Sequence, residues 1–176
     1  MGEDKASMLI GGIPLLSRVV SATRHLGPVQ VVGGNRRVLD LLENIPEVAH
    51  ISDPTNDPGP FGAAVHALGH ATGDEALIVS CDLAQLRSQD VDRLMSARRS
   101  TDADLAVPLV KGHRQWHGLM LASRIIPKLV ASHAAGVRSL QRGFSGLREC
   151  AVVSADTAFF GDVDFPEDVA ALETPL

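Results

Sequence analysis

Several features that mark particular classes of protein are scarce or missing in this sequence. Cysteine occurs only twice in 176 residues, as Cys81 and Cys150, which is too rare for a disulfide framework and favours a reducing compartment. No stretch reaches the roughly 18 to 20 consecutive apolar residues that a membrane-spanning helix needs. Residues 1–12 hold acidic side chains and one lysine, unlike the basic start and apolar core of a secretion signal. We therefore expect a cytoplasmic protein with no membrane partner.

An excess of basic residues is also lacking, since 16 Lys and Arg face 21 Asp and Glu for a net charge of −5. Nucleic acid is not an expected partner, because affinity for its backbone depends on neutralising phosphates with lysine and arginine. There is no repeat, no low-complexity stretch and no linker rich in proline, glycine or serine. With 45% hydrophobic residues, the sequence predicts one folded domain over residues 1–176.

Helix and strand patterns alternate along the chain. Apolar residues at helical spacing predict helices at 13–26, 36–42, 61–71, 88–98, 125–134, 140–147 and 166–172. Short apolar or β-branched runs predict strands at 29–32, 48–51, 76–81, 103–109, 117–122 and 150–153. The alternation predicts an α/β fold with a mainly parallel sheet and helices on both faces. Ligands of such sheets bind beyond the carboxyl ends of the strands, so candidate site residues are sought there.

Two segments have the composition of phosphate or nucleotide contacts. Lys5, in the run MGEDK, can place an ammonium group against a phosphate, although a solvated lysine has the same sequence. The proline-rich loop 53–62 ends in GPFG at the start of a predicted helix. Glycines let a backbone approach a ligand closely, and the N–H groups at a helix start bind anions or carbonyl groups. A plain surface crossover is the alternative for this loop.

Two acidic segments have the composition of a divalent cation site. Asp82 directly follows the most apolar predicted strand, where a carboxylate can hold Mg²⁺ beside substrate phosphates, but aspartate also commonly starts a turn. Asp162 and Asp164 have the period-two spacing that places both on one side of an extended segment. Either of them could supply a second carboxylate to the ion held by Asp82.

Histidine and cysteine give weaker signals. The pairs His66/His70 and His113/His117 have the spacing of metal ligands on a helix, but the first has no third ligand nearby in sequence and the second spans a turn. We interpret all four as ordinary core or surface histidines. Cys81 is interpreted as a small core residue, because no electropositive residue adjoins it.

Together, the order and spacing of these segments resemble the MobA-like nucleotidyltransferases. That family opens with a segment of the type LAGGxSxRMGxDK, whose last third is similar to residues 1–6, and continues with LxxGxxPLLxRV, which is similar to residues 8–19. Its Asp-plus-GPLAG loop, its CDxPxL motif and its closing (N/D)-x-(N/D)-TPED motif correspond to Asp53 with 59–62, to 81–86 and to 162–168. The resemblance covers the whole chain.

The resemblance implies a three-layer, Rossmann-like fold of the nucleotide-diphospho-sugar transferase type. It implies a reaction in which a phosphate of molybdenum–molybdopterin attacks the α-phosphate of GTP, so that GMP is transferred and pyrophosphate is released. Lys5 and Asp82 would be the catalytic residues, and Asp82 and Asp164 the Mg²⁺ ligands. The positions that the resemblance assigns to the nucleotide are Lys5, Asp53, Gly59, Pro60, Gly62 and Asp82.

The sequence departs from the family pattern most at its start. The LAGGxSxR segment and the strand before it are absent, and with them the backbone nest around the phosphates. A lost central strand of about five buried apolar residues forfeits about 8 to 15 kcal/mol, so we expect a shortened chain whose sheet lacks its first strand. Ala84 and Phe165 also replace a proline and a threonine, but neither is one of the proposed carboxylates.

Two other functions stay open at this stage. One is a catalytically impaired or non-catalytic relative that keeps the fold and binds molybdopterin or a partner protein. The other is an enzyme of the same kind that uses CTP or a phosphosugar in place of GTP. Transient contact with other proteins of molybdenum cofactor biosynthesis is expected, whereas the sequence does not predict an oligomeric state.

Overall fold

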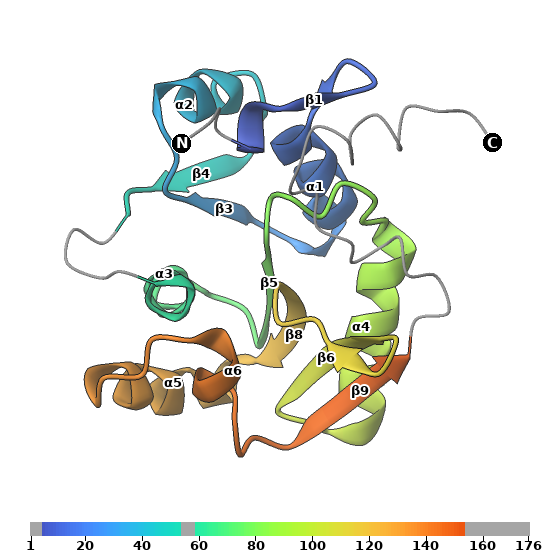
Figure 1. The fold of residues 1–176 in the computed structure, drawn as a ribbon, viewed down its shortest axis with the longest axis vertical. Helices are drawn as coiled ribbons and strands as arrows, with labels where there is room; N and C mark the ends of the chain where they lie inside the picture. Colours follow the sequence, from blue (N-terminus) through green and yellow to red (C-terminus); the bar gives the residue numbers. More distant parts are fainter. Residues whose placement is uncertain (1–4, 54–58, 154–176) are drawn as a thin grey trace.

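The computed structural model of the chain describes residues 5–53 and 59–153. Its helices are η1 (Lys5–Ser7), α1 (Leu15–Thr23), η2 (Arg24–Leu26), α2 (Arg36–Leu42), α3 (Pro60–Leu68), α4 (Ser88–Thr101), η3 (Ser123–Ile125), α5 (Ile126–Ala134) and α6 (Leu140–Gly143), where η marks a 3-10 helix. Its strands are β1 (Leu9–Ile10), β2 (Ile13–Pro14), β3 (Val29–Val32), β4 (Val48–Ile51), β5 (Glu75–Val79), β6 (Leu105–Val110), β7 (His113–Arg114), β8 (Gly118–Ala122) and β9 (Glu149–Val153). The alternation confirms the α/β class (Figure 1). The helix predicted at 166–172 lies outside the described residues.

The main strands form two separately hydrogen-bonded groups, which are called here the two parts of the sheet. β3 and β4 pair in parallel as the first part. In the second part β5, β8 and β6 are neighbours in that order, and β6 also pairs with β7 and, in parallel, with β9. β8 runs antiparallel to both β5 and β6, so this part is mixed where the alternation predicted mainly parallel strands. The reason is the short connection from β6 to β8, which holds only β7 and turns, because a parallel return needs a long crossover such as a helix.

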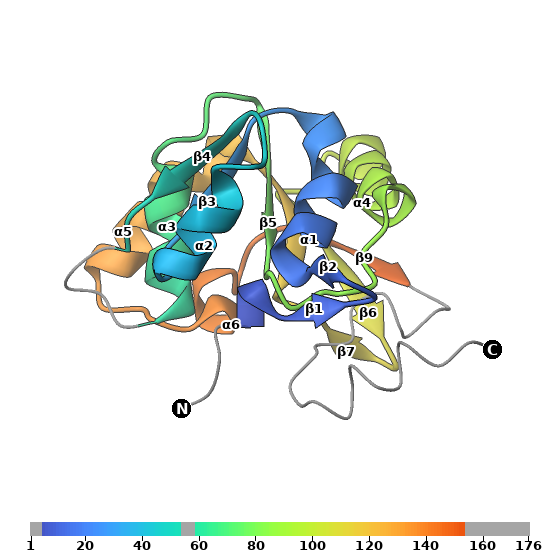
Figure 2. The same ribbon diagram turned by 90° about the horizontal axis from the view of Figure 1, so that it is seen from above.

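Helices cover both faces of the second part of the sheet. On one face α3, α5 and α6 form a core cluster with β6 and β8 that includes Phe61 and Leu119. On the other face α1 and α4 form a second cluster that includes Leu94 and Met120. The predicted three-layer arrangement is confirmed, with α3 and α5 on one side of the strands and α1 and α4 on the other (Figure 2).

A hairpin precedes α1, where the sequence pattern predicted helix from residue 13. β1 and β2 pair antiparallel, and Gly11 and Gly12 make the turn at φ +57° and +76°. Such backbone angles favour glycine, and Gly-Gly between short strands is a hairpin signal. Arg18 of α1 donates from Nη2 to the Ile10 carbonyl at 2.6 Å and so fixes the hairpin to the helix. The helix therefore begins at Leu15.

The other helix ends follow from local sequence. Asn35 caps α2, since its side chain accepts from the N–H groups of Arg37 at 2.9 Å and Val38 at 3.4 Å. α4 runs past residue 98 to Thr101 and ends where Asp102 turns left-handed at φ +48°. Among the described helices, none has both the length and the apolar character needed to cross a membrane.

Candidate active site

The segment after β5 carries a carboxylate with an unused buried oxygen. The Ser80 N–H donates to the His117 carbonyl at 2.8 Å, and the chain then turns at Asp82, whose carbonyl accepts from the Ala84 N–H at 2.9 Å. The next two residues, Leu83 and Ala84, are buried. The Oδ1 atom of Asp82 is buried and has no hydrogen-bond partner among the described residues. Buried polar atoms are nearly always partnered, and Mg²⁺ prefers carboxylate oxygens, so Asp82 fits a Mg²⁺ ligand.

Lys5 lies in the part of the molecule that adjoins this segment. Helix η1, which begins at Lys5, contacts α1 and α2. Its next residue, Ala6, belongs to the same hydrophobic cluster as Cys81, the residue before Asp82. The structure therefore brings together the two segments that hold the predicted catalytic residues. Cys81 is packed against this cluster, as expected of a core cysteine.

Asp53 lies just beyond β4, against the end of β3. Gly33 follows β3 at φ +75°, and its N–H donates to the Ile51 carbonyl at 2.9 Å. A Cβ built on Gly33 would lie 2.6 Å from Asp53 Oδ1, so only glycine allows the carboxylate to approach this closely. His50 Nε2 lies 3.0 Å from the Gly33 carbonyl oxygen, which fixes the turn from the other side. Asp53 thus lies at the strand ends and is exposed.

The start of α3 is held by the loop that follows α5. Gly59 caps the helix at φ +137°, and a Cβ there would lie 3.1 Å from the Arg138 carbonyl oxygen. The Phe61 N–H donates to that same carbonyl at 3.3 Å, while Pro60 has no N–H to offer. Gly62 is buried in the first turn. One of the helix-start donors that the sequence suggested for a ligand is therefore already used inside the protein.

Aromatic rings fix the position of this helix start. The ring of Phe61 is buried and meets the ring of Phe144 edge-on, with centroids 5.8 Å apart. Phe144 in turn stacks on Trp116, with centroids 6.1 Å apart and planes at 10°. Phe61 also lies directly over Gly143, where any Cβ would overlap its ring. The loop at 59–62 is thus set by residues far away in the sequence.

The β1–β2 hairpin is a neighbour of Asp82 that the sequence reasoning missed. Ile10 and Leu15 form a small buried cluster with Ala84, two positions beyond Asp82. The signal was present, because Gly11 and Gly12 separate two short apolar pairs. The helical spacing after Ile13 concealed it.

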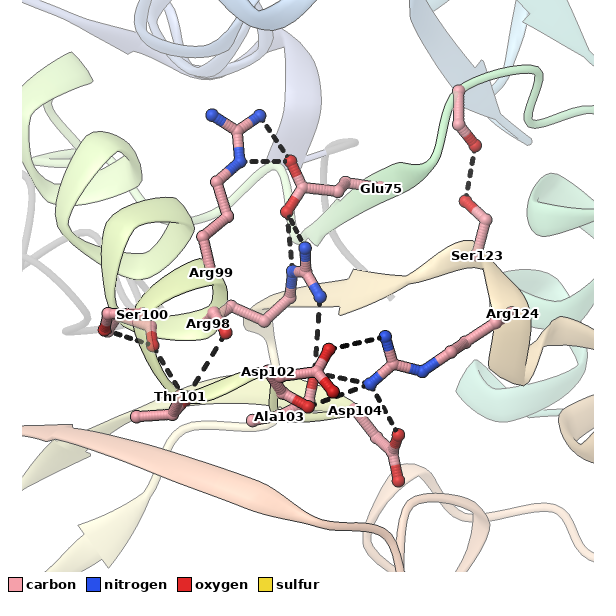
Figure 3. A network of polar contacts seen from close by, with 12 residues as sticks. Glu75, Arg98, Arg99, Ser100, Thr101, Asp102, Ala103, Asp104, Ser123 and Arg124 are labelled. Carbon is pink, nitrogen blue, oxygen red and sulfur yellow. Dashed lines mark hydrogen bonds and ion pairs between the residues drawn. The ribbon is translucent and has the colours of Figure 1, made fainter.

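The opposite end of β5 holds a charged network of a different kind (Figure 3). Arg98 donates from Nε to Glu75 Oε1 at 2.6 Å and from Nη1 to the Ala103 carbonyl at 3.3 Å. Arg99 donates from Nε to Glu75 Oε2 at 2.8 Å. Burial raises the pKa of Glu75, but the hydrogen bonds and charges of Arg99 and Arg98 outweigh it and hold the pKa below its usual value. Both carboxylate oxygens are occupied, so this network is structural.

Asp104, at the start of β6, belongs to a neighbouring network. Its Oδ1 accepts from Arg124 Nη2 at 3.1 Å and from Arg148 Nη2 at 3.3 Å, and its Oδ2 accepts from the Arg148 N–H at 3.1 Å. Burial raises the pKa of Asp104, but the bonds from Arg148 and Arg124 outweigh that effect and lower it. Arg124 also donates to Asp102 Oδ1 at 2.9 Å, as Figure 3 shows. These bonds tie β6, η3 and the start of β9 together.

The structure describes the histidine pairs but not the predicted second carboxylate. Asp162 and Asp164 lie outside the described residues, so the second carboxylate stays a prediction. His66 and His70 meet edge to face, with ring centroids 5.5 Å apart. Over residues 5–53 and 59–153, no group of three or more His, Cys, Asp or Glu side chains is arranged to hold a metal ion.

Comparisons with known proteins agree with this geometry. A family model described as the MobA-like NTP transferase domain matches residues 1–161. A molybdenum cofactor guanylyltransferase of Photobacterium profundum is 35% identical over 177 residues, covering 99% of this chain and 84% of its own, and one of Vibrio parahaemolyticus is 28% identical over 175 residues, with the same two coverages.

Solved structures show the same fold. Molybdopterin-guanine dinucleotide biosynthesis protein A of Archaeoglobus fulgidus superimposes with a TM-score of 0.77 at 15% identity, covering 98% of this chain and 90% of its own. The 2-C-methyl-D-erythritol 4-phosphate cytidylyltransferase of Thermus thermophilus superimposes with a TM-score of 0.74 at 16% identity, covering 96% and 92%. The three-layer arrangement is thus the fold of these two solved structures. The chain belongs to the MobA-like NTP transferase family of nucleotidyltransferase enzymes.

Proposed function

We propose that this protein transfers GMP from GTP to molybdenum–molybdopterin in molybdenum cofactor biosynthesis. An oxygen of the acceptor's terminal phosphate forms a bond to the α-phosphorus of GTP, the bond from that phosphorus to the bridging β-phosphate oxygen breaks, and pyrophosphate leaves. Family membership and the guanylyltransferase relatives support the reaction class. The observation that carries the proposal to this chain's own residues is the buried Oδ1 of Asp82, which has no hydrogen-bond partner among residues 5–53 and 59–153.

Each residue would contribute charge or position. Asp82, with Asp164 as the second carboxylate, would hold Mg²⁺, which neutralises phosphate charge and acts as a Lewis acid when bound. Lys5 directs its ammonium to the phosphates. Asp53 and the turn that begins at Gly59 hold the base and ribose. Transfer of a phosphoryl-type group asks the protein for positioning and charge neutralisation, so no covalent nucleophile is needed.

Calorimetry with GTP tests the proposal on the whole chain, with and without Mg²⁺. We expect magnesium-dependent binding by the natural protein and its loss in Asp82→Ala. The matched control is Asp40→Ala, because Asp40 is an exposed carboxylate on α2 whose ion pair with Arg36 lies on the helix surface. A folded protein that binds GTP equally well with either substitution would contradict the assignment of Asp82.

The acceptor and the base are tested by released pyrophosphate. Each of GTP, CTP, ATP and UTP is supplied with molybdenum–molybdopterin, and GTP should give the fastest release. Faster release with CTP would favour the cytidylyltransferase alternative. Binding of molybdopterin without release from any nucleotide would favour the non-catalytic relative.

The working compartment and the protein partners follow from this pathway. The enzyme would act in the cytoplasm and make transient contact with other proteins of molybdenum cofactor biosynthesis. Fractionation of cells that express the tagged full chain tests the first point, with recovery in the membrane fraction as the contrary result.

A further inference from the structure

The single tryptophan of the chain, Trp116, lies at the same edge of the sheet as Asp82. β8 runs antiparallel beside β5, and the Ser80 N–H donates to the His117 carbonyl at 2.8 Å. Trp116 directly precedes this hydrogen bond on one strand, and Asp82 follows it on the other. Figure 2 shows α6, β7 and the β1–β2 hairpin along this edge, at the bottom of the view. Trp116 is therefore a neighbour of the segment that holds Asp82.

One face of the Trp116 indole is covered by another ring. Phe144 stacks on it, with centroids 6.1 Å apart and planes at 10°. Phe144 is buried and also meets Phe61 edge-on at 5.8 Å, so its position is fixed by the core. Trp116, in contrast, is only half-buried. The protein thus holds an indole rigidly from one side and leaves part of it accessible at the edge of the sheet.

The chemistry of such a surface selects a flat heteroaromatic ring, because aromatic rings stack on one another with little dependence on ring type. The proposed reaction has two such rings, the guanine of GTP and the pterin of molybdopterin. The predicted nucleotide positions that the structure describes lie within residues 5–82, and the turn proposed for the base begins at Gly59. Phe144 joins Phe61 of that turn to Trp116, so one aromatic ring separates Trp116 from the proposed base contacts. The accessible indole is therefore better placed for the pterin.

We infer that Trp116 is a specificity-determining residue for the acceptor. The pterin ring of molybdenum–molybdopterin stacks on the accessible part of the indole, and this contact directs the acceptor's terminal phosphate toward the nucleotide phosphates beside Asp82. The inference rests on the proposed function for the identity of the acceptor. It adds the residue that distinguishes this acceptor from a phosphate compound without a flat ring.

Kinetics of pyrophosphate release test the residue in the full chain. Trp116→Leu keeps an apolar side chain but removes the aromatic face. We expect the KM for the acceptor to rise about tenfold, or about 1.4 kcal/mol, and the KM for GTP to change less than about twofold. Trp116→Phe keeps an aromatic face and should recover most of the loss. The matched control is Ile126→Ala, which should alter neither KM, because Ile126 packs against the same core cluster but lies beyond the other end of β8.

Fluorescence reports on Trp116 directly, because the chain has one tryptophan and no tyrosine. Acrylamide quenches an indole by contact, so a stacked pterin should shield the ring. We expect the bimolecular quenching constant, measured from fluorescence lifetimes, to fall at least about twofold with molybdenum–molybdopterin, because the pterin would cover the face opposite Phe144. GTP alone should leave the constant unchanged.

Three results would overturn the inference: equal increases in both KM values for Trp116→Leu, a KM for the acceptor in Trp116→Phe as high as in Trp116→Leu, or shielding by GTP and not by the acceptor. Failure of the proposed function has a different signature, which is no pyrophosphate release from any nucleotide by the natural protein. Shielding needs no turnover, so in that case it still supports the contact with Trp116, and its absence overturns it. Should Trp116→Leu fail to fold, Trp116→Phe and the shielding of the natural protein decide.

Discussion

Strand β5 has a carboxylate at each end, and the two are treated in opposite ways. At the amino end, Glu75 is bound by two arginines, and both of its oxygens accept hydrogen bonds. Just beyond the carboxyl end, Asp82 has a buried oxygen with no partner among the described residues. A carboxylate at one end of the strand thus has hydrogen bonds to both oxygens, whereas the carboxylate beyond the other end has a buried oxygen without a partner among the described residues.

The difference supports the proposed role of Asp82. A paired carboxylate contributes its interaction energy to folding and has no free oxygen for a ligand. An unpaired buried oxygen costs stability, and a bound cation would offset that cost. The amino ends of β5 and β6 are accordingly fastened by the Glu75 and Asp104 networks, while Asp82, beyond the carboxyl end of β5, has a buried oxygen with no partner among the described residues.

The largest effect on stability should come from removing the Glu75 carboxylate at the amino end of β5. Glu75→Ala leaves the buried guanidinium of Arg98 without its carboxylate, and we expect a loss of about 3 to 5 kcal/mol in the free energy of unfolding. Urea unfolding measures the loss. The control is Glu149→Ala, which removes an exposed ion pair with Arg114 and should cost at most about 1 kcal/mol. Similar losses of unfolding free energy in the two variants would show that the Glu75 network contributes no more to stability than a surface ion pair.

Beyond the carboxyl end of β5, substitution of Asp82 should lower activity and leave stability nearly unchanged. Asp82→Asn keeps the size of the side chain but removes the charge that the proposed ion needs, so we expect pyrophosphate release to fall by about 100-fold, or about 2.7 kcal/mol in the barrier. Its free energy of unfolding without ligand should stay within about 1 kcal/mol of the natural protein. A strongly destabilised but active Asp82→Asn protein would reverse the assignment.

Acid should weaken the contacts of Glu75 at the amino end of the strand. Because the pKa of Glu75 is lowered in the folded state, its contribution to stability is fully present above the unfolded value of about 4.3 and is lost as the pH falls through the folded value. Urea unfolding between pH 7 and pH 3 should therefore show a flatter pH dependence for Glu75→Gln than for the natural protein. Parallel pH profiles would show that the ion pair adds nothing.

The smallest effect on stability should come from a surface ion pair that lies at neither end of β5. His25 and Asp92 join η2 to α4 at 2.9 Å, but their side chains are 38% and 50% exposed. Asp92→Ala should change the free energy of unfolding by no more than about 1 kcal/mol and leave pyrophosphate release unchanged. A larger change would mean that exposure is a poor guide to the worth of ion pairs in this protein.

Sequence reasoning was most accurate where the signal was local. Alternating periodicities predicted the α/β class, which the structure confirms, whereas the role predicted for Asp82 from its place after an apolar strand stays a prediction. It did not indicate that β8 runs antiparallel to its neighbours, because a strand run such as 117–122 has the same composition in either direction. It also missed the hairpin at Gly11, since the helical spacing that follows was the stronger pattern.

Contacts between distant residues explain what the sequence could not predict. The Phe61 N–H is used by the Arg138 carbonyl, and no pattern near residue 61 indicates a partner so far along the chain. The pairing of Glu75 with Arg98 and Arg99 depends in the same way on how α4 packs beside β5. The site contributions of all the predicted residues, which are Lys5, Asp53, Gly59, Pro60, Gly62, Asp82 and Asp164, stay predictions.

The close packing of the Phe61 ring against Gly143 has a consequence for mutational surveys of this protein. Any side chain at position 143 must push the ring away, and the first turn of α3 would move with it. In a survey of all substitutions, position 143 should therefore be as intolerant as a position that contacts the nucleotide. Intolerance alone would wrongly mark Gly143 as part of the active site, so each intolerant position in this family needs a separate measurement of folding before it is assigned to chemistry.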